Sequence, residues 1–199
     1  TAGSSTVRGL VINRLTRPLL IAGASQNIIE GNILGLGAAG NSIPQSSNVT
    51  TILNSSKNLI GGNIPAARNL LSGLLLDLNA NANRVEENYL GTRADGLTKA
   101  LGSAGTGLTI DSSSKNVISA NVISANGFNG ISIVSASIRS NGLSSPRASS
   151  NRIVSNFIGV GADGVTPLGN QGRGVSLFGE ATGNIIGEAQ PGTGKIKHW

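Results

Sequence analysis

The sequence predicts an all-β solenoid, in which short strands of successive coils stack into parallel sheets. The composition and a recurring motif both favour this fold class. The chain has 29 Gly, 22 Asn and 25 Ser among its 199 residues, and only 12% of its residues are charged. Gly, Asn and Ser disfavour helices, because they cost backbone entropy or compete with the helical backbone for hydrogen bonds. A hydrophobic fraction of 38% still provides a packed core, so disorder is disfavoured too.

The motif has nine residues and begins Asn-x-[Ile/Val]. In the first five copies Asn returns at the sixth position, as in Asn32, Asn63 and Asn88, and an aliphatic residue usually occupies the eighth. Pro65 interrupts that eighth position in the second copy. Coils are therefore expected to start near residues 5, 27, 58, 83, 116, 151 and 184. The copies occupy residues 27–35, 58–66, 83–91, 116–124, 151–159 and 184–192, with a degenerate copy at 5–13.

Each unit is predicted to contain two or three short strands, because a further aliphatic segment lies between consecutive copies of the motif. A unit of this kind cannot bury its apolar face alone, whereas stacked units bury it against one another. The recurring Asn is expected at coil corners, where its side chain can bond the equivalent Asn of the neighbouring coils. The aliphatic segments between copies occupy residues 19–21, 50–53, 74–78, 107–111, 130–134 and 174–178.

Three loops at 35–44, 91–102 and 159–170 resemble one another and carry the extra length of their coils. Asp95 and Asp163 occupy equivalent positions before Gly in the last two loops. Asp followed by Gly is typical of a tight turn, so a structural role is expected for both. A shared ligand or metal contact is the alternative.

The repeats and the following GxxADGxxxxLG loop resemble right-handed parallel β-helix proteins, which include the pectate-lyase-like superfamily and bacterial surface proteins. The resemblance covers about residues 5–190 and implies one right-handed parallel β-helix domain of about six to seven coils over residues 1–199. Residues 187–199 are expected to form an end cap or a tail. A propeller or sandwich is the competing architecture, but its antiparallel repeats should show hairpin turns.

The resemblance also implies a secreted or cell-surface protein with a polysaccharide or another glycan as its partner. Many proteins of this kind are hydrolases, lyases or esterases that act on polysaccharides. A non-catalytic structural or adhesive segment of a larger surface protein is the alternative. A hydrolase of this kind requires no cofactor, whereas the resemblance to lyases of this superfamily implies Ca²⁺ as a ligand of the lyase alternative.

The candidate catalytic residues are Asp77 and Asp111. Alignment of residues 74–77 with 108–111 places these carboxylates on consecutive coils, with Asn54 one coil earlier in the same column. A pair so close could act as acid and base, or as acid and nucleophile. The alternative is that both residues end a strand and cap a solvated turn.

Four further residues are candidates for substrate binding. Tyr89 and Phe157 share the seventh position of the motif two coils apart, so their rings could stack sugars, or they could pack under a loop. Arg84 and Arg152 also occupy equivalent positions, where they could bind substrate or form solvated ion pairs.

Several other partners are disfavoured by the composition. The formal charge is +6, but the basic residues are scattered and aromatic residues are 3% of the chain, so nucleic acid is not expected. No apolar run is long enough to insert into a membrane. The chain has no Cys and one His, His198, which excludes a histidine-based metal site. Self-association is expected through the coil ends, or through an apolar outer stripe at Ile28, Leu59, Val117 and Ile185.

Overall fold

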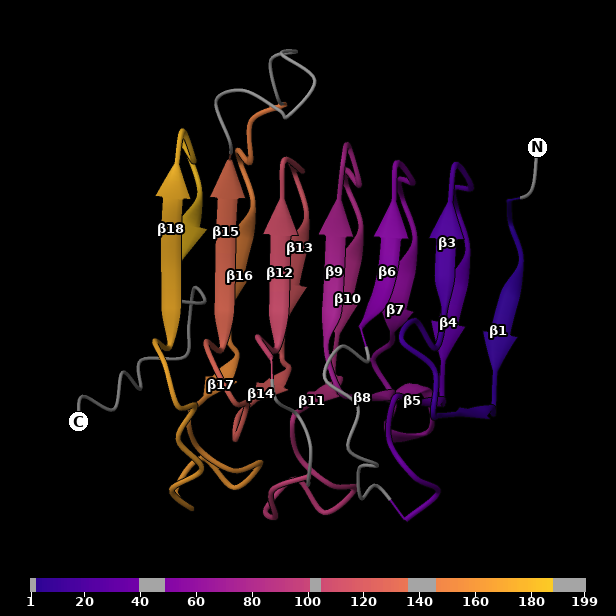
Figure 1. Ribbon diagram of the computed structural model, residues 1–199, viewed down its shortest axis with the longest axis vertical. Coiled ribbons are helices and arrows are strands. Elements are labelled where there is room, and N and C mark those ends of the chain that lie inside the picture. Colours follow the sequence, from indigo (N-terminus) through magenta and orange to yellow (C-terminus); the bar gives the residue numbers. More distant parts are fainter. Residues whose placement is uncertain (1–2, 40–48, 101–104, 136–145, 188–199) are drawn as a thin grey trace.

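The computed structural model is a parallel β-helix with three sheets, which confirms the predicted all-β solenoid (Figure 1). The structure describes residues 3–39, 49–100, 105–135 and 146–187. The chain visits the sheets in the same order in every coil, so each strand pairs with its equivalents one coil before and one coil after. We call these sheets A, B and C in the order in which the chain enters them.

Within the described residues, sheet A has seven strands, and sheets B and C have six each. Sheet A contains β1 (Thr6–Arg8), β4 (Ile28–Glu30), β7 (Leu59–Gly61), β10 (Arg84–Glu86), β13 (Val117–Ser119), β16 (Arg152–Val154) and β19 (Ile185–Ile186). Sheet B contains β2 (Val11–Ile12), β5 (Ile33–Leu34), β8 (Leu70–Leu71), β11 (Tyr89–Leu90), β14 (Val122–Ile123) and β17 (Phe157–Ile158). Sheet C contains β3 (Leu20–Ala22), β6 (Thr50–Leu53), β9 (Leu74–Asp77), β12 (Leu108–Asp111), β15 (Ile131–Ser135) and β18 (Val175–Gly179).

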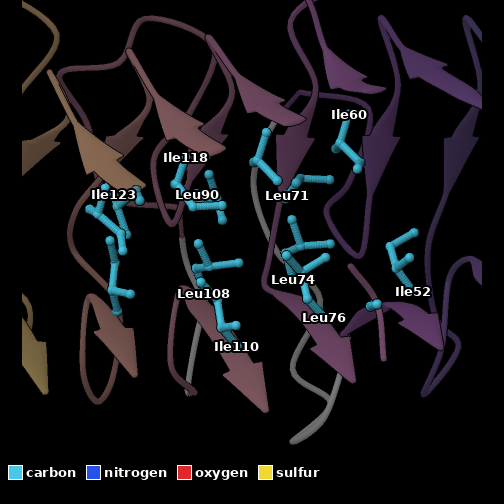
Figure 2. Close-up of a cluster of buried hydrophobic side chains, with 14 of the residues drawn as sticks. Ile52, Ile60, Leu71, Leu74, Leu76, Leu90, Leu108, Ile110, Ile118 and Ile123 are labelled. Atoms are coloured by element: carbon cyan, nitrogen blue, oxygen red, sulfur yellow. The ribbon is translucent and has the colours of Figure 1, made fainter. Parts of the chain in front are cut away.

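The core lies between the three sheets and consists of aliphatic columns that run along the solenoid (Figure 2). In sheet C, Ile52, Leu76 and Ile110 occupy consecutive coils in one register and are fully buried. The in-register stacking follows from the motif, because each coil places an aliphatic residue at the same point of its winding path. Residues on either side of these positions face outwards, since side chains alternate along a strand.

Two columns of buried Asn side chains line the corners before sheets A and B, as the motif predicts. In the first column, the side-chain amide of Asn58 donates to Oδ1 of Asn83 at 2.8 Å. In the second column, Asn88 donates in the same way to Asn121 at 3.1 Å. The first column contains Asn27, Asn58, Asn83, Asn116, Asn151 and Asn184, and the second contains Asn32, Asn69, Asn88, Asn121 and Asn156.

The prediction that Asn63 belongs to the second column is wrong, because Asn69 takes that place. Asn32 donates to Oδ1 of Asn69 at 3.0 Å, while Asn63 is exposed. The chain leaves the coil after Gly61, forms the 3₁₀ helix η1 (Pro65–Ala67) and returns to the corner six residues later than the motif predicts. Pro65 has no backbone N–H for a sheet ladder, so the strand cannot form at the expected position.

The carboxylates of Asp95 and Asp163 accept hydrogen bonds from their own loops and so stabilise the turns. This supports the structural role that the sequence predicts for both residues. Oδ1 of Asp95 accepts hydrogen bonds from the backbone N–H groups of Leu97 and Thr98, both at 2.9 Å. Its Oδ2 accepts a third bond from the Thr98 hydroxyl at 2.6 Å. The Thr98 hydroxyl, followed by the Leu97 amide, lowers the pKa of the Asp95 carboxyl. Asp163 makes the equivalent bonds, and the Thr166 hydroxyl is the main cause of its lowered pKa.

Candidate functional site

Asp77 and Asp111 lie directly opposite each other on β9 and β12. Both side chains point away from the core, because the residues alternate between buried and partly exposed along each strand. Adjacent parallel strands lie about 4.8 Å apart, so the carboxylates are held as a stacked pair. The expectation that Asn54 continues this column is wrong, since Leu53 pairs with Asp77 instead.

A hydrogen bond from the neighbouring residue orients the Asp111 carboxylate. The Ser112 hydroxyl donates to Oδ1 of Asp111 at 2.8 Å, which leaves the second oxygen of that carboxylate for another contact. Ser112 has a left-handed backbone with φ of 49°, so the chain turns sharply away from the sheet directly after Asp111.

A groove of about 690 Å³ lies on the same outer face of sheet C. Its floor includes Thr51, Leu75 and Thr109, which form one outward column on three consecutive coils. Thr16 and Arg17, which precede β3, contribute to its wall, as does Thr106, which precedes β12. The groove therefore combines hydroxyl groups, an aliphatic surface and one guanidinium.

The carboxylate pair lies beside this groove. Leu75 and Thr109 precede Asp77 and Asp111 by two residues on the same strands, so all four side chains emerge on the same face. Two residues along a strand span about 7 Å, which is roughly the width of one sugar ring. The carboxylates therefore lie about one sugar ring away from the floor of the groove. A molecule bound across Leu75 and Thr109 can thus reach the carboxylates.

The two aromatic candidates differ in exposure although they share one column. Tyr89, Val122 and Phe157 are in register on consecutive strands of sheet B. The Tyr89 ring is only 8% exposed, because Gly96 lies against it and the guanidinium of Arg68 covers it at 4.1 Å from the ring centre. Phe157 is 45% exposed. Tyr89 therefore packs under its loop, and only Phe157 presents a surface for stacking.

Arg84 and Arg152 lie on the outer face of sheet A, in one column with Val117 between them. The guanidinium of Arg84 contacts Oε1 of Glu86 at 2.6 Å, so its charge is compensated within its own strand. The structure therefore does not bring these two residues together with the carboxylates of sheet C. Their predicted role in binding the same substrate finds no support in this placement.

The walls of the groove could not be found from the repeat alone. Alignment of the strands does place Thr51, Leu75 and Thr109 in one column, which was a usable signal. Thr16, Arg17 and Thr106 come from connecting segments whose course the motif does not determine. His198 and the expected cap or tail at 187–199 lie outside the described residues, apart from Gly187.

Within the described ranges, no group of three or more Asp, Glu or His side chains is gathered in a way that could hold a metal ion. The same residues contain no helix of the length and apolarity needed to cross a membrane. No protein-family model matches the chain, and no curated protein matches it either.

Proposed function

We propose that this β-helix binds a glycan in the groove of sheet C and hydrolyses a glycosidic bond with Asp77 and Asp111. One observation carries the proposal: two stacked carboxylates lie on the same face as a groove lined by hydroxyl and aliphatic groups. Hydroxyl groups can exchange hydrogen bonds with a sugar, while an aliphatic floor such as Leu75 covers its apolar ring face. A glycan is an extracellular polymer in most settings, so we place the protein outside the cell or on its surface.

The spacing of the pair favours one hydrolytic route. Retaining glycosidases hold their two carboxyl groups about 5–5.5 Å apart, and adjacent strands hold equivalent residues about 4.8 Å apart. One carboxyl group protonates the glycosidic oxygen, while the other attacks the anomeric carbon and forms a covalent intermediate. Water, deprotonated by the first residue, then hydrolyses that intermediate and returns both groups to their starting state. This route uses only the two side chains and water.

The proposal is tested by incubating the protein with neutral, uronate-containing and esterified glycans and measuring the reducing ends released. Release from at least one glycan is expected, and Thr109→Trp should abolish it by filling the groove. Val165→Trp is the matched control, because Val165 is 62% exposed on a loop outside sheet B. An unsaturated product would show a lyase instead, with Ca²⁺ dependence as its further test. If no glycan is bound or cleaved, the proposed function is wrong.

A non-catalytic role as a structural segment is the second candidate. The observation that favours it is the exposure of core positions at the last described coil, where Leu177 and Ile186 face inwards but are 48% and 42% exposed. An uncovered solenoid end can receive further coils or another molecule. This role predicts no turnover of any glycan and a protein that associates through its ends.

A further inference from the structure

The last described coil of the solenoid exposes residues whose equivalents in the inner coils are buried. Leu177 on β18 continues the column of Ile133, which is fully buried, but Leu177 is 48% exposed. Ile186 on β19 continues the column of Ile153, which is 2% exposed, but Ile186 is 42% exposed. The strands β17, β18 and β19 carry no charged residue, and each is the last strand of its sheet among the described residues.

We infer that this end face binds a second copy of the chain, tail to tail, through antiparallel pairing of β18 with the β18 of the partner. The edges of β17, β18 and β19 that no other described strand pairs follow one another along the winding path, with β18 in the middle. A two-fold axis through the centre of β18 therefore pairs β18 of one copy with β18 of the other. The same axis pairs β17 of each copy with β19 of the other. The backbone groups of all three strand edges then have hydrogen-bonding partners in the other copy, and the assembly closes as a dimer.

The charges at the two ends of β18 favour this antiparallel arrangement. Arg173 lies four residues before Leu177, and Glu180 lies three residues after it. When the two β18 strands pair around Leu177, Arg173 of each copy lies opposite Ala181 of the other, one residue along the chain from Glu180. Both side chains are exposed, and in the single chain Glu180 contacts Arg147 at 3.3 Å.

The alternative, head-to-tail stacking in the register of sheet C, is disfavoured by charge and by strand number. Extending that register beyond β18 would place Ser176 opposite Leu20 of the next copy, and hence Arg173 opposite Arg17. Like charges directly opposite each other destabilise a strand pair. Among the described residues, sheet A also has one strand more than sheets B and C, so pairing of β19 with β1 would leave β17 and β18 without a partner from those residues.

Cysteine cross-linking tests the arrangement directly, because the chain contains no Cys of its own. At the two-fold axis Leu177 lies opposite Leu177 of the partner, where antiparallel Cα atoms are about 4.5–5.5 Å apart, within reach of a disulfide. Leu177→Cys is therefore expected to form a covalent dimer under mild oxidation. Leu20→Cys, which is 44% exposed on the first coil, is the matched control and should remain uncross-linked.

Sedimentation velocity of the full chain gives the second readout. The parent is expected to sediment as a concentration-dependent dimer, with no larger species. Arg173→Glu and Glu180→Arg should each weaken the dimer at least tenfold, and the double variant should restore it although the Arg147 contact is lost. A parent that is monomeric at every concentration would overturn the proposal, with the end then covered by another part of the chain. Cross-linking of Leu20→Cys would overturn it in favour of pairing between two first coils, and species larger than a dimer would overturn it in favour of head-to-tail stacking.

Discussion

The side-chain amide of Asn69 donates to Oδ1 of Asn88 at 2.8 Å, and Oδ1 of Asn69 accepts the side-chain amide of Asn32 at 3.0 Å. Asn69 thus links three coils although it lies outside the nine-residue motif. Its backbone N–H also donates to Asn88, and its amide donates to the carbonyl of Ile29 at 2.8 Å. The corner of the third coil therefore depends on Asn69 and not on Asn63.

Replacing Asn69 by Ala should destabilise the protein by about 3 kcal/mol, because Asn32 loses its acceptor and each unsatisfied buried group costs about 1–3 kcal/mol. Asn63→Ala is the matched control and should change the free energy of unfolding by less than about 0.5 kcal/mol, as exposed substitutions usually do. Urea unfolding of the two variants measures both values. Equal effects would show that the corner does not depend on Asn69.

The two rings of sheet B should differ in their contribution to stability. Tyr89→Ala should cost about 3 kcal/mol, since removing a buried aromatic side chain leaves a cavity. The loss of the Arg68 contact over the ring adds to this cost. Phe157→Ala, at 45% exposure, should cost clearly less in the same unfolding experiment. A larger effect at Phe157 would contradict the burial of Tyr89 under its loop.

Acid should remove the contribution of Asp95 to stability. Its pKa is lowered below the usual value of 3.8, chiefly by the hydrogen bond from the Thr98 hydroxyl. A carboxyl whose folded-state pKa is lowered stabilises the protein above the unfolded-state pKa, and this contribution disappears as the pH falls through the folded-state pKa. The difference in Tm between the parent and Asp95→Ala should therefore be largest at neutral pH and shrink below about pH 4. A difference that does not change with pH would contradict this role of the carboxylate.

Much of the fold could be predicted because each coil places aliphatic residues at the same points of its path, where they must be buried. The predicted strand at 50–53 coincides with β6, and the one at 74–78 ends one residue beyond β9. The stacking of Asp77 on Asp111 followed from the same alignment. These features depend on periodic aliphatic residues, which only a stacked solenoid buries.

Features that depend on one coil alone could not be predicted. The insertion that moves the corner from Asn63 to Asn69 uses a 3₁₀ turn that the motif does not encode. Tyr89 and Phe157 share a motif position, yet their exposure differs because Ala162 of the next loop also packs near Tyr89. The walls of the groove come from segments such as Thr16 and Thr106, whose course is set by tertiary packing.

The most direct test of the proposed function is the rate of reducing-end release by Asp77→Asn and Asp111→Asn, with Glu86→Gln on sheet A as the control. Each Asp variant should lose about 10²–10⁴-fold in rate, the usual contribution of a positioned acid or base. The Tm should stay close to that of the parent, because both side chains face outwards, and Glu86→Gln should retain the parent rate. Unchanged release by either Asp variant would contradict the assignment of this pair as the catalytic residues.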